Sequence, residues 1–133
     1  MARTAEELLA EARAGLPHRP SPAEAFVAQA SGALLIDIRG DDQRRADGLI
    51  PGAVVILRNV LEWRCDPVSP WRHAAIQSRD QPIVVVCHEG FQSSLAAATL
   101  QRLGLRNAMD MDGGFTAWRR AGLPVVPADT ALS

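Results

Sequence analysis

The feature that most constrains the fold is an apolar run that ends in a cysteine, Ile83-Val84-Val85-Val86-Cys87, lying between Pro82 and Gly90. A short run rich in β-branched residues and bounded by residues that break regular structure is typical of a buried strand. Similar apolar runs occupy residues 33–38, 53–57 and 108–111, and helical patterns alternate with them. Apolar strands that alternate with helices predict a parallel sheet with both faces covered.

Helix signals surround these strands. Thr4 and Glu7 form a capping box for a helix over residues 4–14, and Ser21 and Glu24 form another for a helix that starts at Pro22. Further helices are expected over residues 71–79, 93–103 and 114–121, while residues 39–48 read as a polar turn. With an edge strand within residues 16–20, the elements predict an α/β fold: a central parallel sheet of about five strands flanked by helices on both faces.

The charge of the chain is nearly balanced, with 14 basic and 15 acidic residues and a net charge of -1. Nucleic acids and anionic membranes demand a basic face, so neither is expected as a partner. No apolar run approaches the roughly 18 residues of a membrane helix, and the charged N-terminus lacks the apolar core of a signal peptide. We therefore expect a cytoplasmic protein with one main domain, in which a lone thiol stays reduced.

Cys87 stands where the strongest strand ends and a loop into a helix begins, and ligands bind at this end of parallel strands. Backbone N–H groups at the start of a helix lack partners within it, so they can turn toward the sulfur and form an anion-binding nest. Such a setting favours the thiolate, which is the nucleophile. From the strand position alone, a small buried hydrophobic residue is an equally good interpretation of Cys87.

Four motifs weigh against that second interpretation. The segment from Cys87 to Ser93 resembles the active-site loop of the rhodanese family, Cys-x-x-Gly-x-(Arg or small polar)-Ser. Leu35-Ile36-Asp37-Ile38-Arg39 is similar to the family strand that ends in Asp-x-Arg, and Gly48-Leu49-Ile50-Pro51-Gly52-Ala53 is similar to its Gly-His-Ile-Pro-Gly-Ala turn. Asp112-Gly113-Gly114-Phe115 with Ala117-Trp118 and Gly122-Leu123-Pro124-Val125 resembles its C-terminal signature. The motifs follow one another in the family order.

The resemblance implies a rhodanese-like domain over residues 20–126, with a helical extension over residues 1–19 and a tail over residues 127–133. It also implies a sulfurtransferase of the thiosulfate:cyanide type, in which Cys87 takes sulfane sulfur from a small donor and carries it as a persulfide. A thiophilic acceptor then removes the sulfur; cyanide, a small thiol or a protein thiol would serve. No cofactor and no metal are implied. Substrate contacts are expected from His88, Glu89, Gly90, Phe91, Gln92, Ser93, Arg58 and Arg39.

The loop departs from the family pattern at three positions. Gln92 stands where an Arg is frequent, and His88 replaces another residue that is frequently basic. Glu89 adds a negative charge, which disfavours a thiolate and repels a dianionic donor. We therefore expect weak turnover with thiosulfate, a preference for a neutral or thiol-bound donor, and a gain from Gln92→Arg. A fourth departure lies outside the loop, where Leu49 replaces a His of the turn.

Residues outside the loop leave alternatives open. Arg58 follows a strand and can reach the edge of the sheet where Cys87 lies, or stay on the surface. Arg39 lies two residues after Asp37 and is more readily a structural ion-pair partner than a substrate ligand. Cys65 has no motif around it and reads as an incidental thiol, unless it folds next to Cys87. Trp63 and Trp71 would line the pocket mouth or cover the surface.

Two other functions stay open at this point. A rhodanese-like module without catalysis could bind a partner or regulate it. A cysteine phosphatase or an arsenate reductase would need a Cys-x5-Arg phosphate loop, but the sixth residue after Cys87 is Ser93, so the bidentate clamp for a phosphoryl group is missing.

Overall fold

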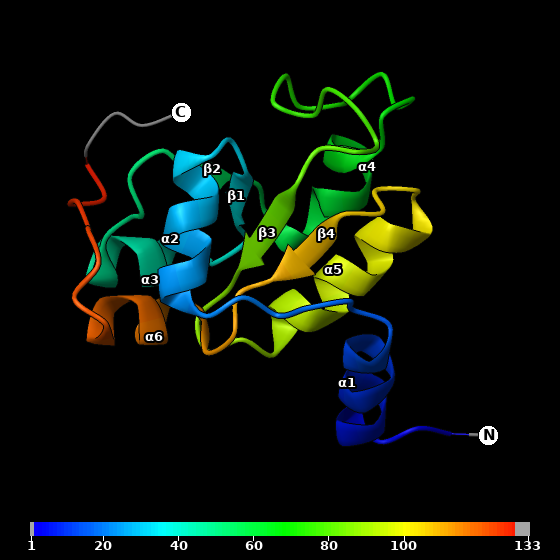
Figure 1. Cartoon of the computed structure of the whole chain (residues 1–133), viewed down its shortest axis with the longest axis horizontal. Helices are drawn as coiled ribbons and strands as arrows, with labels where there is room; N and C mark the ends of the chain where they lie inside the picture. The colour runs from blue at the N-terminus through cyan, green and yellow to red at the C-terminus, as the bar shows by residue number, and fades with distance from the viewer. Residues whose placement is uncertain (1, 130–133) are drawn as a thin grey trace.

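A computed structural model describes residues 2–129 of the chain, so positions 130–133 of the expected tail lie outside the described residues. The described strands are β1 (Leu34–Asp37), β2 (Val54–Val55), β3 (Ile83–Val86) and β4 (Ala108–Asp110). They form one parallel sheet in the order β2-β1-β3-β4 (Figure 1). The carboxyl ends of these strands therefore share one edge of the sheet, where the loop after β3 begins.

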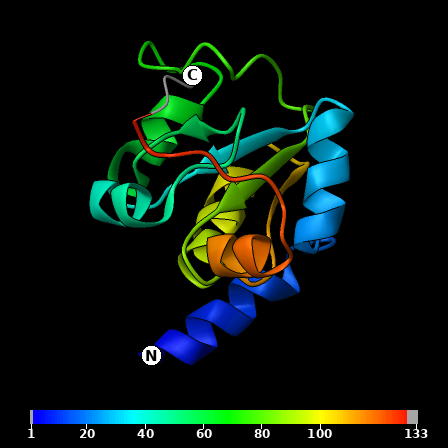
Figure 2. The same ribbon diagram turned by 90° about the vertical axis from the view of Figure 1, so that its left-hand side faces the viewer.

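Helices cover both faces of this sheet. The helices of the described residues are α1 (Ala5–Ala14), α2 (Pro22–Ala30), α3 (Asp41–Asp47), α4 (Leu61–Cys65), α5 (Gln92–Arg102) and α6 (Gly114–Arg120), with a 3-10 turn η1 (Arg58–Val60) before α4. The core on one face contains residues of α4 and α5, and the core on the other face contains residues of α2 and α6. Figures 1 and 2 show α1 extending away from this layered body, with its closest packing against α5. No helix of residues 2–129 has the length and apolar character to cross a bilayer.

Strand periodicity points the cysteine toward one particular helix. Alternate side chains of a strand face opposite sides of the sheet. Ile83 and Val85 pack into the core beside α5, whereas Val84 and Val86 pack into the opposite core. Cys87 continues the first series and joins the core beside α5. Its sulfur is thereby directed toward the N-terminal end of that helix.

Both predicted capping boxes are confirmed. Thr4 Oγ1 accepts the N–H of Glu7 at 3.1 Å, and Ser21 Oγ accepts the N–H of Glu24 at 3.2 Å. Each glutamate returns a bond to the N–H of its cap residue, 2.9 Å in both cases. The helices that begin at these residues end near the predicted positions.

Three predicted elements are wrong. Residues 16–20 form no strand, because Pro17 and Pro20 lack the N–H that a ladder requires, so the described sheet has four strands rather than about five. Residues 71–79 form no helix, since the Gln81 side chain bonds the Gln77 N–H and the Ala75 carbonyl and supports an irregular turn instead. Residues 39–48 contain helix α3, which has no buried residue and hence no apolar periodicity to reveal it.

Candidate functional site: the Cys87 pocket

The Cys87 sulfur lies in a cup of hydrogen-bond donors. Sγ accepts the backbone N–H of Gly90 at 3.1 Å and that of Ser93 at 3.3 Å, and the thiol donates to Ser93 Oγ at 3.3 Å. The Ser93 amide belongs to the first turn of α5, where an N–H has no partner within the helix. These two inward N–H groups can therefore stabilise negative charge on the sulfur, as such groups stabilise a bound anion.

The carbonyl groups of the same loop are held outward. The Cys87 carbonyl accepts the Phe115 N–H at 2.8 Å, and the His88 carbonyl accepts the Thr116 N–H at 3.0 Å. Both donors come from the first turn of α6. Because each C=O shares a rigid peptide group with the next N–H, these two bonds fix the His88 and Glu89 peptide groups and so the path of the loop up to Gly90, whose own N–H contacts the sulfur.

Glycines allow the loop and α6 to approach this closely. A Cβ on Gly114 would lie 2.7 Å from the His88 oxygen, and a Cβ on Gly90 would lie 2.9 Å from the Gly113 nitrogen. Gly90 also has φ +91°, in the left-handed region that side chains disfavour. The last two of the four motifs, the cysteine loop and the Asp112-Gly113-Gly114 signature, thus pack directly against each other.

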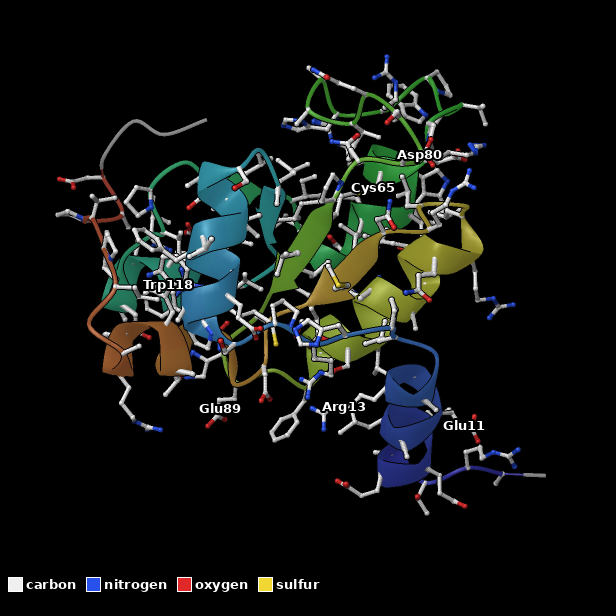
Figure 3. The ribbon with its side chains drawn as sticks, viewed as in Figure 1. Glu11, Arg13, Cys65, Asp80, Glu89 and Trp118 are labelled. Carbon is white, nitrogen blue, oxygen red and sulfur yellow. The ribbon has the colours of Figure 1, made fainter. Side chains whose placement is uncertain are left out.

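A pocket of about 400 Å³ opens in front of the sulfur. It is lined by Ile38, Arg39, Gly40, Gln43, Arg58, Cys87, His88, Glu89, Phe91 and Gln92. Every residue expected at the site lines it except Gly90 and Ser93, which contact the sulfur directly. Cys87 is 6% exposed, while Glu89 lies at the exposed outer side of the loop (Figure 3).

Arg39 is buried in an ion pair. Its Nη2 donates to Asp37 Oδ2 at 2.8 Å and to the Gly48 carbonyl at 2.7 Å, and its guanidinium lies 3.8 Å from the centre of the Phe115 ring. Its other terminal nitrogen, Nη1, is buried and has no hydrogen-bond partner within residues 2–129. Arg39 is thus the structural ion-pair partner expected of it, and it also contributes to the wall of the pocket.

Arg58 reaches the pocket from η1. Its Nη1 donates to both carboxylate oxygens of Glu62, at 3.1 and 3.2 Å, one helical turn further on. Glu62 therefore reduces the positive charge that Arg58 presents. The third polar neighbour, His88, has Nδ1 at 4.0 Å from Asp47, beyond hydrogen-bond distance. The pocket holds two arginines, but each already has a carboxylate partner.

A buried carboxylate behind the loop escaped the sequence analysis. Asp110 Oδ2 accepts the hydroxyls of Ser93 and Ser94, at 2.8 and 2.9 Å. Arg19 donates to both Asp110 oxygens, at 3.0 and 3.1 Å, and this hydrogen-bonded pairing raises the pKa of the arginine. The available signal was an acidic residue inside the apolar run 108–111.

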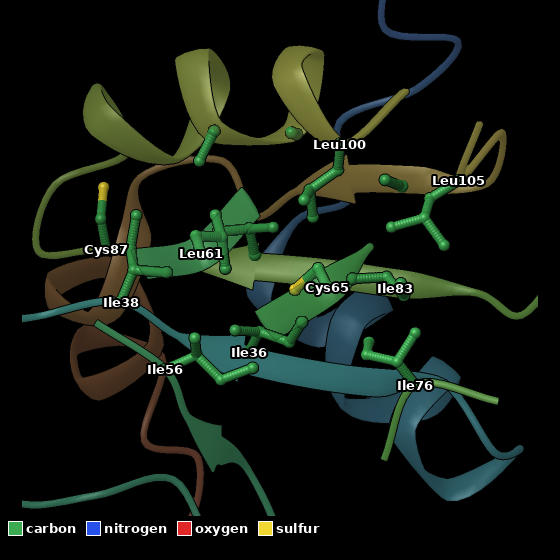
Figure 4. Close-up of a cluster of buried hydrophobic side chains, with 14 of the residues drawn as sticks. Ile36, Ile38, Ile56, Leu61, Cys65, Ile76, Ile83, Cys87, Leu100 and Leu105 are labelled. Atoms are coloured by element: carbon green, nitrogen blue, oxygen red, sulfur yellow. The ribbon is translucent and has the colours of Figure 1, made fainter. Parts of the chain in front are cut away.

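The second cysteine is remote from this chemistry. Cys65 is fully buried in α4, and that burial raises the pKa of its thiol to about 12. Figure 4 shows it among apolar side chains of the core, at a different place from Cys87. Trp63 and Trp71 are exposed and do not line the pocket, whereas Phe115 and Trp118 belong to the core. Within residues 2–129, no group of three or more His, Cys, Asp or Glu side chains is arranged to hold a metal ion.

Comparison with known families agrees with this geometry. The model of the rhodanese-like domain matches residues 21–121. The chain therefore belongs to the rhodanese-like family. The thiosulfate sulfurtransferase GlpE of Pseudomonas entomophila is 37% identical over 113 residues, which cover 85% of this chain and 91% of that protein. A sulfurtransferase of Allochromatium vinosum is 30% identical over 75% of this chain and 84% of its own length. Family membership and these relatives make the chain a rhodanese-like sulfurtransferase in the general sense.

Solved structures share the fold. A Rhodopseudomonas palustris protein, described as of unknown function and a possible tyrosine phosphatase, superposes with a TM-score of 0.85 at 35% identity and covers 95% of this chain and 96% of its own. A rhodanese-related protein of Thermoplasma volcanium superposes with a TM-score of 0.64 at 27% identity, over 82% of this chain and 98% of its own. The rhodanese-like α/β fold expected from the four motifs is thus confirmed.

Proposed function

We propose that Cys87 moves a sulfane sulfur atom from a small donor to a thiophilic acceptor by carrying it as a persulfide. The cup of two N–H groups and one hydroxyl around Sγ is the observation that supports this most strongly. In the first step the thiolate attacks the outer sulfur of the donor, and the donor's S–S bond breaks. With thiosulfate, sulfite leaves with the bonding electron pair. In the second step the acceptor attacks the outer sulfur of the persulfide and the Cys87 thiolate leaves, so the enzyme returns to its first state.

The cup favours the anionic forms along this route. A thiolate, a persulfide anion and the departing thiolate each place negative charge on sulfur, where fixed N–H groups need no reorganisation. The pocket in front of the sulfur provides room for a small donor and for the second sulfur atom. The Ser93 hydroxyl accepts the hydrogen of the thiol and donates its own to Asp110, so it would bond an anionic sulfur by turning that hydrogen from Asp110 to the sulfur.

The charges of the pocket bear on the choice of donor. Arg58 is the cation best placed to attract an anionic donor, but Glu62 shares its charge, and Glu89 lies at the rim of the same pocket. Gln92 supplies no cation. The pocket is consequently less positive than a loop with Arg would make it, so we propose that thiosulfate turns over weakly and that a neutral or thiol-bound donor is preferred. A small thiol, cyanide or a protein thiol would serve as acceptor.

Steady-state kinetics test this function. Thiocyanate formation from thiosulfate and cyanide is measured while both concentrations vary, and then with a glutathione persulfide donor. The proposal expects parallel double-reciprocal lines, the mark of a covalent intermediate, and a higher kcat/KM with the thiol-bound donor. Cys87→Ala should show no turnover above background, and Cys65→Ala serves as the matched control.

Four outcomes would contradict the proposal. Intersecting lines, or turnover that survives in Cys87→Ala, would exclude transfer through this cysteine. Hydrolysis of p-nitrophenyl phosphate that depends on Cys87, without sulfur transfer, would support a phosphatase instead. Absence of all turnover together with absence of sulfur on Cys87 would indicate a binding module.

A further inference from the structure

Two arginines hold the outer side of the Cys87 loop, and neither belongs to the matched domain. Arg13 lies in α1 and Arg19 in the connector that follows it, whereas the family match begins at residue 21. In Figure 3, Arg13 extends from the end of α1 toward the loop between β3 and α5. The R. palustris structure covers 95% of this chain, which leaves out fewer residues than the 20 that precede the match, so its likeness extends into this segment.

Both arginines bond the same carbonyl. Arg13 Nη2 donates to the Gly90 oxygen at 2.8 Å, and Arg19 Nη2 donates to it at 3.2 Å. Arg13 Nε also donates to Ser94 Oγ at 3.0 Å, and its guanidinium lies 5.9 Å from the centre of the Phe91 ring. Gly90 is the residue whose N–H contacts the sulfur. The arginines therefore hold the Gly90 carbonyl on the outside of the loop, beyond the two carbonyls that α6 bonds.

The two arginines differ in charge balance. Arg19 is paired with Asp110 and with Asp112, at 3.0 and 3.2 Å. Arg13 has no carboxylate partner among the described residues, since its bonds go to a carbonyl and a hydroxyl. The positive charge of Arg13 is thus unbalanced, and it lies at the carbonyl of Gly90, the residue whose N–H contacts Sγ. That is the kind of charge that the loop lacks at Gln92.

The other charges near the sulfur are largely compensated. On the pocket side, Arg39 is paired with Asp37 and Arg58 with Glu62. Within the loop, Glu89 contributes an exposed negative charge, and His88 faces Asp47 at 4.0 Å. From β4, Asp110 contributes a buried negative charge that Arg19 balances. Arg13 is left as the source of net positive charge at the loop.

From these contacts we propose that Arg13 and Arg19 are positioning residues of the active site: they keep the Gly90 carbonyl outward, and Arg13 supplies from the N-terminal helix the cation that the loop itself lacks. This proposal rests on the proposed function, because its purpose is to stabilise negative charge on the Cys87 sulfur. The segment over residues 1–19 then contributes to the reaction at Cys87 and is not a dispensable extension.

The test compares single variants in the full chain by two readouts. The first is the rate at which Cys87 gains sulfur from thiosulfate, followed by intact mass; the second is the pH midpoint of its alkylation by iodoacetamide. Arg13→Gln should slow loading by about three- to ten-fold and move the midpoint to higher pH. Arg13→Lys keeps the charge and should restore the midpoint. Arg3→Gln, on the same segment but bonded to exposed Glu11, is the control.

The variant Asp110→Asn distinguishes an electrostatic role of the two arginines from a purely structural one. It removes a negative charge behind the loop while keeping an acceptor for the Ser93 and Ser94 hydroxyls, so the midpoint should move down. Arg19→Gln leaves Asp110 unbalanced and should move the midpoint up, and the double variant Arg19→Gln/Asp110→Asn should return toward the wild type. If the arginines have only a structural role, the rate of sulfur loading should fall in each variant in proportion to its loss of thermal stability. The alkylation midpoints of Arg19→Gln and Asp110→Asn should then not shift in opposite directions.

The inference is overturned if Arg13→Gln loads sulfur within about two-fold of the wild type and keeps its alkylation midpoint, or if Arg19→Gln and Asp110→Asn shift the midpoint in the same direction. Failure of the proposed function looks different, because then the wild type itself gains no sulfur. The alkylation midpoints still decide the role of the arginines in that case.

Discussion

The two cysteines of this chain are both buried, yet one is surrounded by polar groups and the other by aliphatic side chains. Cys87 follows a strand, and its sulfur contacts two N–H groups and a hydroxyl at the wall of an open pocket. Cys65 lies in the short helix α4, enclosed by aliphatic side chains, with its pKa raised to about 12 by burial (Figure 4). The comparison teaches that burial alone does not make a thiol inert. What matters is whether the enclosing groups are polar donors or hydrocarbon.

The comparison is tested most strongly by removing each thiol in turn. Cys87→Ala should reduce sulfur transfer by about a thousand-fold or more, because no other group can hold the sulfur atom. Cys65→Ala should leave kcat/KM within about two-fold, since it changes only core packing. Thiocyanate release from a common donor measures both. Similar losses in the two variants would mean that Cys65 also takes part in the reaction.

The role of the donor cup is sharpened by Gly90→Ala. A Cβ there would meet the Gly113 nitrogen at 2.9 Å, and φ is +91°, so the loop must move and its amide must leave the sulfur. We expect turnover to fall by about ten- to a hundred-fold. Gly122→Ala is the matched control, with φ +75° but no described residue within 4 Å of the added Cβ. If both variants keep full turnover, the Gly90 amide is not needed for catalysis.

The hydrocarbon setting of Cys65 predicts a pH dependence of stability. Its folded pKa of about 12 exceeds the ordinary value of about 8.5, so above pH 8.5 the unfolded chain releases a proton that the folded chain keeps. The contribution of the protonated Cys65 thiol to the free energy of unfolding is therefore complete below pH 8.5. It is lost as the pH rises toward 12, with a slope of up to about 1.4 kcal/mol per pH unit. Because the chain has neither Lys nor Tyr, few other groups titrate in this range.

Urea unfolding in the presence of a reductant measures this effect. The free energy of unfolding of the wild type, minus that of Cys65→Ala, should fall steadily between pH 9 and pH 11. Both proteins contain Cys87, so its contribution cancels in the difference. A difference that stays constant with pH would show that the Cys65 thiol ionises in the folded protein as it does in the unfolded chain.

The smallest expected effect concerns the charge in front of Cys87. Gln92 lines the pocket, and Gln92→Arg would add a cation there, so kcat/KM for thiosulfate should rise by about three- to ten-fold. The gain should shrink as the salt concentration rises, because the site is partly exposed. Gln92→Leu, which adds no charge, should give no gain. An unchanged or lower rate in Gln92→Arg would refute the electrostatic interpretation of the loop.

Much of the fold could be predicted from the sequence, because its main signals are local. The β-branched run before Cys87, the capping boxes at Thr4 and Ser21 and the glycine after α5 each act over a few residues. The elements that were predicted wrongly lack such a signal in the sequence. Helix α3 buries nothing and so shows no apolar face, and the segment after Trp71 is shaped by the Gln81 side chain, which no periodicity reveals.

The candidate site was predictable only in part. The sequence identified Cys87 and the loop, because both form one continuous motif. It did not identify Arg13, Arg19 or Asp110, because their contacts with the loop, with Ser94 and with one another span 16 to 91 positions along the chain. Such pairings arise from the packing of α1 and β4 around α5, and no short-range pattern in the sequence encodes them.

The central claim is that the sulfur atom in transit is bound to Cys87 and to no other residue. The most direct measurement is peptide mass spectrometry of the wild-type protein after treatment with thiosulfate or a thiol persulfide, with alkylation to trap the product. The account predicts a gain of one sulfur atom on the peptide that contains Cys87, and its loss when cyanide is added. A gain on the Cys65 peptide, or a sulfur that cyanide does not remove, would contradict it.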